Sequence, residues 1–382
     1  MIKRIYILFF IALFLTNCKS PQFVKTKEIS YHTGTAVLWR YNGTYYNQED
    51  KKEYIYFADV FRDRKLMLFN LDGVLEKEIP LNKTIDYYEV TGVVIKDIDT
   101  IIVFDHLGQS SHRITYTDRE GNCWRKIMLN EIVPIENEDI YGFYYSGFGN
   151  SLSDNSFFMR TIWFRYKDRR LYGSTSESKQ QYYRKLYTMP CVLSFNLETL
   201  TYQFALDTLW RYFCPDTALF IGHTIEITSE NNNLFVYTPV SNKLYIMDEE
   251  SFKVKKIITV DSKYSKIGID PYPMAKHKMF FEDKLVAGKI LKVLYDKYNK
   301  MFYVITWHEV SKEEIPFFSE RPFSIHIYNW KFKKLGEQYF EGNTYDPRDC
   351  MVTQKGLLIK HNENSEKYDP TVMKYDLYEL KK

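Results

Sequence analysis

A strand and turn pattern that recurs along the chain most restricts the fold of this sequence. Each copy has short β-rich runs joined by polar turns, and one run ends in a small polar residue before a turn. These end residues are Asn70, Thr117, Asn196, Asp248, Asn329 and Asp376. The steps between them are 47, 79, 52, 81 and 47 residues. Steps near 40–50 residues with several strands each are typical of β-propeller blades.

The repeat therefore predicts an all-β chain that folds as a single β-propeller. The number of copies favours six blades, with seven as an alternative. Blades bury their faces against neighbouring blades, so the ring must close. We expect the segment Val24 to Ser30 to supply the outer strand of the last blade, which otherwise ends at Leu380. A β-sandwich or two separate β domains are the alternatives, and the regular steps disfavour them.

The two long steps predict two inserted loops. The first covers about Tyr166 to Tyr187, and the second covers Ser262 to Lys289. A smaller polar loop, Glu309 to Pro322, interrupts the same repeat as the second insertion. Insertions on a repeat scaffold tend to lie on one face and often form its binding surface. Solvated loops without a ligand are an equally good interpretation.

The N-terminus has the three parts of a secretory signal. Lys3 and Arg4 precede an apolar run from Ile5 to Leu15, which is too short for an ordinary membrane-spanning helix. The next residues, Leu15-Thr16-Asn17-Cys18, resemble the lipobox of bacterial lipoproteins, in which the Cys thiol carries the lipid. Cys18 is therefore the predicted lipid attachment site. The alternative is a plain secreted protein with a cysteine there by chance.

This N-terminus predicts a location in the cell envelope, with the outer membrane favoured over the inner membrane. Cys18 is followed by Lys19-Ser20-Pro21-Gln22, without the acidic run of surface-exported Bacteroidetes lipoproteins, which favours the periplasmic side over the surface. The predicted organisation is a signal peptide at 1–17, a lipidated linker at 18–23 and one β-propeller domain at 24–382. Membrane attachment would be through the N-terminal lipid.

Charge and cysteine usage exclude some partners. The 52 Lys and Arg residues nearly balance the 49 Asp and Glu residues, and no basic face is evident, so nucleic acid is not an expected partner. Four cysteines remain beyond Cys18, and none sits in a C-x-x-C pair typical of zinc sites. We expect buried free thiols rather than disulfides at Cys123, Cys191, Cys214 and Cys350.

Familiar catalytic motifs are absent from the sequence. It has no H-E-x-x-H, G-x-S-x-G, Walker-type or G-x-G-x-x-G motif. The eight histidines are scattered, and only His106 and His112 are near one another, across a predicted hairpin turn. No catalytic residue, metal ligand or cofactor is therefore assigned, and enzymatic activity stays open although it is disfavoured.

Two groups of aromatic and charged residues are ligand-binding candidates at the insertions. Aromatic rings stack on sugars and Arg guanidinium groups grip carboxylates, so the first group suits an acidic glycan or a peptide terminus. In the second group a His stands beside the carboxylate of Glu309, which suits acid–base work, but adjacent residues on a strand point to opposite faces and this disfavours it. Cross-strand pairs that only stabilise a hairpin are the favoured alternative for the first group. The candidates are Trp163, Arg165, Tyr166, Arg169 and Arg170 in the first group, and Trp307 and His308 in the second.

Several segments also resemble a known family. They are the lipobox, Asp99-Thr100-Ile101-Ile102-Val103, Asn233 to Tyr237, Lys243 to Asp248 and Leu294 to Tyr303. Together they look like a Bacteroidetes lipoprotein family whose uncharacterised domain is similar to six-bladed β-propellers. Relatives often have a Gly-Pro-rich segment after the first blade, where this chain has Thr84 to Gly92. The resemblance implies a fold and a cellular location. The family has no assigned catalytic residues that could be transferred to this sequence.

These observations predict a lipid-anchored β-propeller of the cell envelope that acts as a binding or scaffold module. Its partner would be a glycan, a peptide or an envelope protein. The alternative is a propeller-type lyase, lactonase or hydrolase with its site at the central channel. A third possibility is a sensory or assembly partner of a membrane complex. The 33 Tyr, 27 Phe and 6 Trp residues are expected mainly to fill the core between blades.

Overall fold

The computed structural model shows a chain built almost entirely of β-strands. It describes residues 20–35, 41–81, 89–106, 112–133, 139–144, 152–153, 156–165, 192–205, 225–238, 241–269, 285–312, 320–363 and 369–381. Within these ranges, no helix has the length and apolar character needed to cross a membrane. One short helix, α2 (Leu129–Ile132), lies between two sheets.

Four sheets are formed by strands that follow one another in the chain. In each, the first strand lies at one edge and the fourth at the other. The first two contain β2 (Asn42–Asn47), β3 (Lys52–Asp59), β4 (Lys65–Asn70) and β5 (Leu75–Pro80), then β6 (Glu89–Asp97), β7 (Thr100–His106), β8 (His112–Thr117) and β9 (Cys123–Met128). The other two contain β15 (Glu226–Glu230), β16 (Asn233–Tyr237), β17 (Lys243–Asp248) and β18 (Val254–Thr259), then β19 (Lys289–Asp296), β20 (Met301–Trp307), β21 (Phe323–Asn329) and β22 (Lys334–Phe340).

Two further sheets complete the described strands. One has the order β1-β25-β24-β23 and joins both ends of the chain. Its strands are β1 (Gln22–His32), β23 (Tyr345–Thr353), β24 (Gly356–His361) and β25 (Val372–Lys381). The other has the order β10-β12-β13-β14, with the short β11 pairing β12. Its strands are β10 (Asp139–Tyr144), β11 (Leu152–Ser153), β12 (Ser156–Arg165), β13 (Val192–Asn196) and β14 (Tyr202–Ala205).

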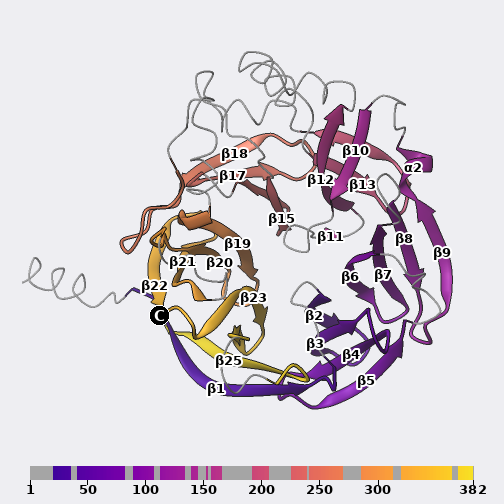
Figure 1. The fold of residues 1–382 in the computed structure, drawn as a ribbon, viewed down its shortest axis with the longest axis horizontal. Coiled ribbons are helices and arrows are strands. Elements are labelled where there is room, and N and C mark those ends of the chain that lie inside the picture. Colours follow the sequence, from indigo (N-terminus) through magenta and orange to yellow (C-terminus); the bar gives the residue numbers. More distant parts are fainter. Residues whose placement is uncertain are drawn as a thin grey trace, which may run out of the picture.

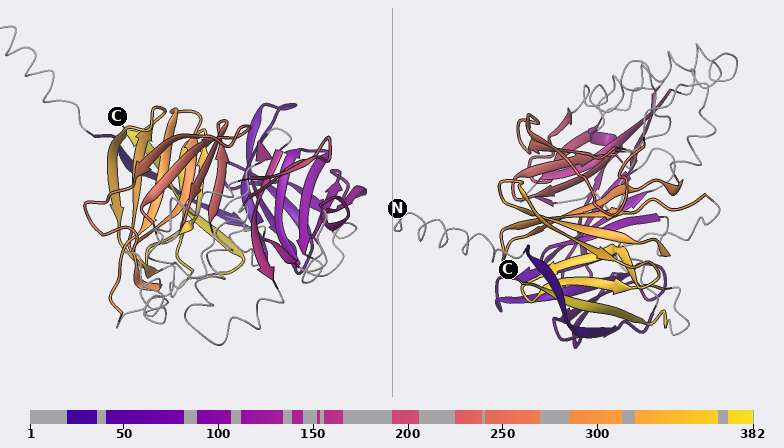
Figure 2. Two further views of the ribbon diagram at one scale, coloured as in Figure 1. Left: turned by 90° about the horizontal axis from the view of Figure 1, so that it is seen from above. Right: turned by 90° about the vertical axis from the view of Figure 1, so that its left-hand side faces the viewer.

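The sheets are arranged around a common centre as a β-propeller (Figure 1). The first strands β2, β6, β15, β19 and β23 lie innermost, and neighbouring inner strands pack against one another. From the side, the strands run mostly across the thickness of the ring (Figure 2). The all-β propeller prediction is confirmed.

The predicted number of blades needs correction. Five sheets of the described residues have the regular four-stranded form, not six or seven. The sheet that contains β12 departs from this form because a fifth strand, β11, forms a hairpin with the start of β12. The long step between the second and third repeats, which includes the first predicted insertion, passes through this sheet. The six-blade prediction therefore counts one blade more than the regular four-stranded sheets among the described residues.

The N-terminal strand closes the ring, as predicted from Val24 to Ser30. Strand β1 pairs antiparallel with the last strand, β25, from Gln22 opposite Lys381 to His32 opposite Val372. The start of β1 therefore lies beside the C-terminal end of the chain (Figure 1). Pairing of this kind covers the edge that β25 would otherwise present to solvent.

The repeated Asn and Asp residues form the turns between the third and fourth strands. The side-chain oxygen Oδ1 of Asn70 accepts hydrogen bonds from the backbone N–H groups of Asp72 and Val74, and Asn329 does the same for Lys331 and Lys333. Asn and Asp favour such turns because their side chains replace a backbone acceptor.

The second repeat uses Asp118 rather than the predicted Thr117. The Oδ1 atom of Asp118 accepts the N–H groups of Glu120 and Asn122, whereas Thr117 is the last residue of β8. Asp376 also departs from the pattern, because it lies inside β25 and no turn follows it. Its carboxylate has a different set of partners.

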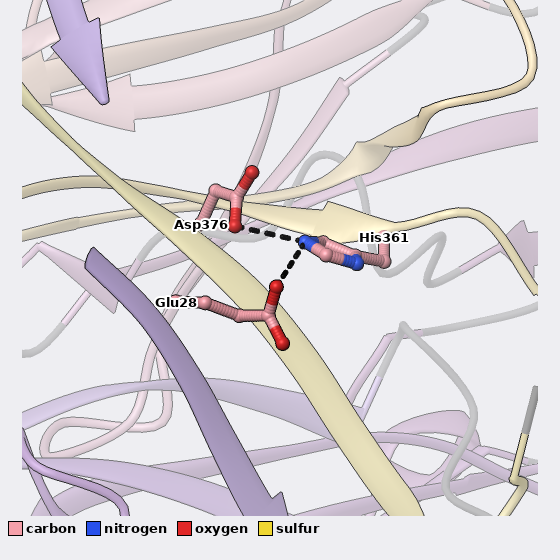
Figure 3. A group of neighbouring side chains, drawn as sticks. All are labelled: Glu28, His361 and Asp376. Atoms are coloured by element: carbon pink, nitrogen blue, oxygen red, sulfur yellow. Dashed lines mark hydrogen bonds and ion pairs between the residues drawn. The ribbon is translucent and has the colours of Figure 1, made fainter. Parts of the chain in front are cut away.

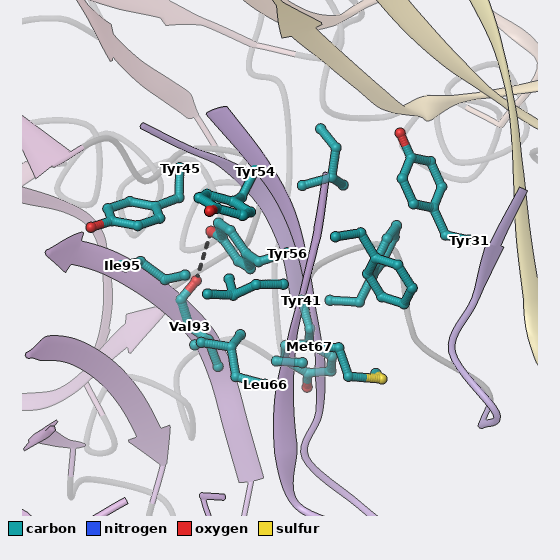
Figure 4. Packing of buried hydrophobic residues seen from close by; sticks show 14 of the residues in the cluster. Tyr31, Tyr41, Tyr45, Tyr54, Tyr56, Leu66, Met67, Val93 and Ile95 are labelled. Atoms are coloured by element: carbon teal, nitrogen blue, oxygen red, sulfur yellow. Dashed lines mark hydrogen bonds between the residues drawn. The ribbon is translucent and has the colours of Figure 1, made fainter. Parts of the chain in front are cut away.

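Aromatic rings fill the space between neighbouring sheets, as expected from the composition. Figure 4 shows the largest cluster, between the sheet that ends in β1 and those that begin with β2 and β6. The Tyr31 ring lies 5.3 Å from that of Phe57, 5.6 Å from Phe69 and 5.7 Å from Tyr375, measured between centroids. Edge-to-face pairs at such distances are favourable beyond the apolar area that they bury.

Candidate functional site

Polar side chains from three inner regions of the ring meet in what we term the axial cluster. Its members are Asn42, Lys292, Asp349, Lys360 and Tyr375. Asn42 comes from β2 and Lys292 from β19, while the other three come from the sheet that closes the ring. Strands β2, β19 and β23 are innermost in their sheets (Figure 1). The cluster therefore lies where separate blades converge.

Asp349 is the centre of the axial cluster. Its Oδ2 atom accepts hydrogen bonds from the Asn42 amide and from the Tyr375 hydroxyl, both at 2.8 Å. The Lys360 ammonium lies 3.8 Å from the same oxygen. A register shift in β23 between Asp346 and Cys350 gives Asp349 its position. Such bulges redirect side chains and are frequent next to functional sites.

The charges at the centre of the axial cluster are deeply buried. Asp349 and Lys360 are each 1% exposed. Burial raises the pKa of the Asp349 carboxyl, although Lys360 and the Tyr375 hydrogen bond oppose the rise. Burial also disfavours the Lys360 charge, but Asp349 and Glu363 outweigh it and raise the pKa of Lys360. The Oδ1 atom of Asp349 has no hydrogen-bond partner among the described residues, which leaves a strong acceptor uncompensated.

The edge of the axial cluster is less buried than its centre. Asn42 and Lys292 are half-buried, as is Arg348, whose guanidinium pairs with the carboxylate of Asp346. The Lys292 ammonium donates to the backbone carbonyl of Cys350 at 3.1 Å and lies 3.5 Å from that of Arg348. Cationic donors, an amide and carboxylate acceptors thus alternate within a short distance.

A further carboxyl group contributes to this charge pattern from β15. Burial raises the pKa of Glu230 to about 7, with Lys292 and Lys297 acting in the opposite direction and Glu249 adding to the rise. Glu230 therefore takes up a proton more readily than an exposed glutamate does. A protonated carboxyl can both donate and accept a hydrogen bond.

The two predicted site residues at the end of β20 lie in the core. Trp307 and His308 are each 4% exposed. Beside them, the Arg321 guanidinium donates to the backbone carbonyls of Leu285, Val286, Ala287 and His308. It also lies over the Trp307 ring, 5.6 Å from the centroid. Arg321 therefore links the segment just before β19 to the residue just after β20. This contact stabilises the fold and accounts for the buried position of Trp307.

His308 is also engaged by its surroundings. Its Nε2 atom is 2.8 Å from the Ser324 hydroxyl, and its ring stacks near Tyr264 at 6.1 Å between centroids. Burial lowers the pKa of His308 to about 4. The ring is therefore neutral at pH 7. The neighbouring side chain of Glu309 is exposed. The backbone N–H of Glu309 donates a hydrogen bond to the Ser265 hydroxyl.

The other predicted candidates are largely outside the described residues. Trp163 and Arg165 belong to β12, opposite Tyr141 and Asp139, but their side chains are not described. Tyr166, Arg169 and Arg170 lie outside the described residues, as does Cys18. Ligand binding by the group around Trp163 stays a prediction.

The remaining histidine and cysteine expectations can be checked in part. His106 and His112 are directly opposite each other across the hairpin of β7 and β8, as predicted. Cys123 and Cys350 are free thiols, half-buried and buried respectively. Cys191 and Cys214 lie outside the described residues.

The axial cluster was not found by sequence reasoning, although two signals for it exist. Asp346-Pro347-Arg348-Asp349 places three charges in a strand that otherwise reads as buried. Lys360 directly follows the apolar run Leu357-Leu358-Ile359. Charged residues are seldom fully buried unless they are paired. A charge inside a buried strand was therefore a usable sign.

Comparison with known proteins supports the fold alone. No protein-family model and no curated protein sequence matches the chain. Among solved structures, a member of the DUF4221 family from Bacteroides vulgatus is similar, with 17% identity, a TM-score of 0.68, and coverage of 96% of this chain and 99% of that one. A candidate exported protein from Bacteroides fragilis has 10% identity and a TM-score of 0.52, covering 96% and 97% of the two chains. Identities this low establish a shared architecture and no shared activity.

Proposed function

We propose that this protein is a binding module of the cell envelope that takes a small polyhydroxylated ligand, of the kind that sugars present, at the axial cluster. The observation that carries the proposal is the convergence of Asn42, Lys292 and Asp349 from three sheets on one buried, charged centre. Ligand sites commonly combine a few converging polar groups with supporting apolar walls.

The chemistry of the axial cluster favours hydroxyl groups as ligands. A hydroxyl both donates and accepts, so it can bond to a carboxylate and to an ammonium or amide at once. Asn42, Lys292 and Arg348 offer half-buried donors beside carboxyl acceptors. Positive and negative side chains are close to balanced there, which disfavours a ligand of high net charge.

Saturation-transfer NMR with glucose, N-acetylglucosamine and glucuronic acid tests the proposal. We expect at least one of these sugars to receive saturation from the wild-type protein. The Lys292→Met variant should lose at least ten-fold in affinity, since a hydrogen bond to a charged group contributes about 1.5–3 kcal/mol. Lys256→Met is the matched control, because Lys256 is exposed on the outer strand β18.

The outcomes of this titration are distinct. Absence of transfer to all three sugars, or an equal loss in Lys256→Met, would overturn a sugar site at the axial cluster. Consumption of a sugar or of its lactone during the titration would instead support the propeller-type lyase, lactonase or hydrolase. That activity should then depend on Asp349, the buried carboxyl of the cluster.

We also propose that the irregular sheet of β10 to β14 acts as a sixth blade. Its residues Leu193 and Phe195 belong to the same apolar cluster as Ile102 and Phe104 of the neighbouring sheet. On its other side, β12 and β11 pack against β15. A sheet with neighbours on both sides takes the place that a blade occupies in a propeller.

The third part of the proposal is attachment to the membrane through lipid on Cys18, in the outer membrane and on its periplasmic side. The lipobox-like sequence before Cys18 supports it. The similar protein from Bacteroides fragilis is itself a candidate exported protein. A tether at this position would enter the propeller directly, since β1 begins at Gln22.

Cys18→Ser is expected to release the protein into the soluble fraction of the cells. A serine cannot form the thioether that carries the acyl chains, and those chains supply the attachment. Immunoblots of membrane and soluble fractions measure the change, with Cys123→Ser as the control that keeps Cys18. Unchanged membrane fractionation of Cys18→Ser would contradict the anchor.

A further inference from the structure

We propose that Glu28, His361 and Asp376 form a binding site for a divalent transition-metal ion of the Zn²⁺ type, which fastens the N-terminal strand onto the last sheet. The three side chains come from three adjacent strands, β1, β24 and β25 (Figure 3). Their ligand atoms all lie within 4.8 Å of one another. This site is separate from the axial cluster and does not depend on the proposed function.

The geometry is close to what a metal requires. The Nε2 atom of His361 lies 2.9 Å from Oδ1 of Asp376 and 4.0 Å from Oε2 of Glu28. Zinc binds imidazole nitrogen and carboxylate oxygen at about 2.0–2.2 Å in a tetrahedron, so its ligand atoms stand roughly 3.3–3.6 Å apart. The His361 and Asp376 atoms must therefore separate slightly, and Glu28 must approach.

The three side chains differ in solvent exposure, and this difference would let the ligand atoms move to the distances that zinc requires. The side chain of Asp376 is 1% exposed, that of His361 is 29% and that of Glu28 is 50%. Asp376 is thus a fixed ligand, while Glu28 can move. Solvent at Glu28 provides the entry path and the water that would complete four-fold coordination, as in zinc sites with three protein ligands.

The second oxygen of Asp376 is already oriented by neighbouring groups. The Tyr345 hydroxyl donates to Oδ2 at 2.5 Å, and the Lys25 ammonium lies 2.5 Å from the same atom. Hydrogen bonds to the non-ligating oxygen of a carboxylate are the outer-shell support typical of metal sites. Oδ1 remains directed at His361, where the metal would sit.

The charges of the surrounding groups are compatible with a dication. Two carboxylates balance the metal, and Lys25 is half-exposed, so its ammonium can turn towards water. His361 would bind the metal as a neutral imidazole through Nε2, with its ring proton on Nδ1. Glu28 and Asp376 would bind as carboxylates.

The position of Asp376 shows that it does not cap a turn, unlike its counterparts in the other sheets. Its counterparts Asn70, Asn329 and Asp248 cap turns between the third and fourth strands of their sheets. The last sheet has no such turn, because β1 arrives from the other end of the chain. A metal there would replace the missing covalent connection by joining β1 to β24 and β25.

Thermal unfolding of the full chain with saturating Zn²⁺, compared with the same protein in EDTA, tests the site. We expect the unfolding midpoint to rise by about 4 °C at a free metal concentration near one hundred times Kd. Isothermal titration should give one Zn²⁺ per chain. His361→Gln keeps a donor beside Asp376 but lacks the imidazole ligand, so it should lose both signals.

Controls separate the site from general metal effects. His32→Gln removes an exposed histidine on the same strand β1 and should leave both signals unchanged. Should His361→Gln fail to fold, Glu28→Gln is the alternative, since Glu28 is half-exposed and its replacement costs little stability. The proposal would be overturned if Zn²⁺ did not raise the unfolding midpoint of the wild type. It would also be overturned if both ligand variants showed the same midpoint shift as the wild type, or if Mg²⁺ raised the wild-type midpoint as much as Zn²⁺ does.

Discussion

Deletion of residues 20–32, which removes β1, is expected to abolish cooperative unfolding of the propeller. The deletion strips β25 of its partner along ten register positions, from Gln22 to His32. It also removes Phe23, Ile29 and Tyr31, which are buried in two core clusters. An open ring leaves both an unpaired strand edge and exposed apolar surface. Circular dichroism during urea titration should show a broad transition with a reduced m-value.

A peptide of residues 20–32 supplied separately provides the control. Because β1 binds by strand addition, this peptide should restore a sharp transition to the truncated chain. The peptide with Tyr31→Ala should fail, since removing a buried aromatic ring costs about 3–5 kcal/mol. The peptide with Tyr31→Phe should act like the natural one, because the Tyr31 hydroxyl has no hydrogen-bond partner among the described residues. A truncated chain that unfolds sharply without any peptide would show that closure by β1 is dispensable.

Local chemistry explains why the propeller and its closure could be predicted from the sequence. The turn residues accept hydrogen bonds from backbone N–H groups no more than four positions away, as Asn70 does from Val74. Such a signal is present in a short window of sequence and recurs with the fold. The error at Thr117 has the same origin, since Asp118 is adjacent and makes the turn. Spacing alone does not distinguish neighbouring polar residues.

The irregular sheet and the axial cluster could not be predicted in the same way. The regular steps gave no sign that β11 would add a hairpin to β12, because two paired residues leave no periodic pattern. Asp349 and Asn42 are bonded across 307 positions of sequence. Partners so distant meet only when the ring is closed, and no local pattern in the sequence identifies which side chains then face each other.

The candidate group at Trp307 shows that residue type alone does not identify a binding partner. Trp307 beside Arg321 has the aromatic and guanidinium character that suits ligand recognition, yet the guanidinium is used on four backbone carbonyls. Buried carbonyls at loop bases require donors as strongly as ligands do. Residue type therefore identified a polar interaction but not its partner.

Lys360→Met is expected to destabilise the protein by about 3–5 kcal/mol, the cost of breaking a buried ion pair from one side. The variant leaves Asp349 buried near Asn42 and Tyr375 without its neighbouring cation. Glu363, the other partner of Lys360, is 34% exposed and can return to water. The penalty therefore falls on Asp349. Urea titration monitored by tryptophan fluorescence measures it, with Lys333→Met as an exposed control.

The pH dependence and a second substitution identify the cause of this loss. The pKa of Asp349 is already raised by burial, and removing Lys360 raises it further. The folded variant then binds a proton more tightly than the unfolded chain, so its deficit should shrink as pH falls from 7 towards 5. Asp349→Asn in the Lys360→Met background removes the stranded charge and should recover most of the lost stability at pH 7. A deficit that persists in the double variant at every pH would assign the loss to packing of the Lys360 side chain, because only a charge responds to protonation.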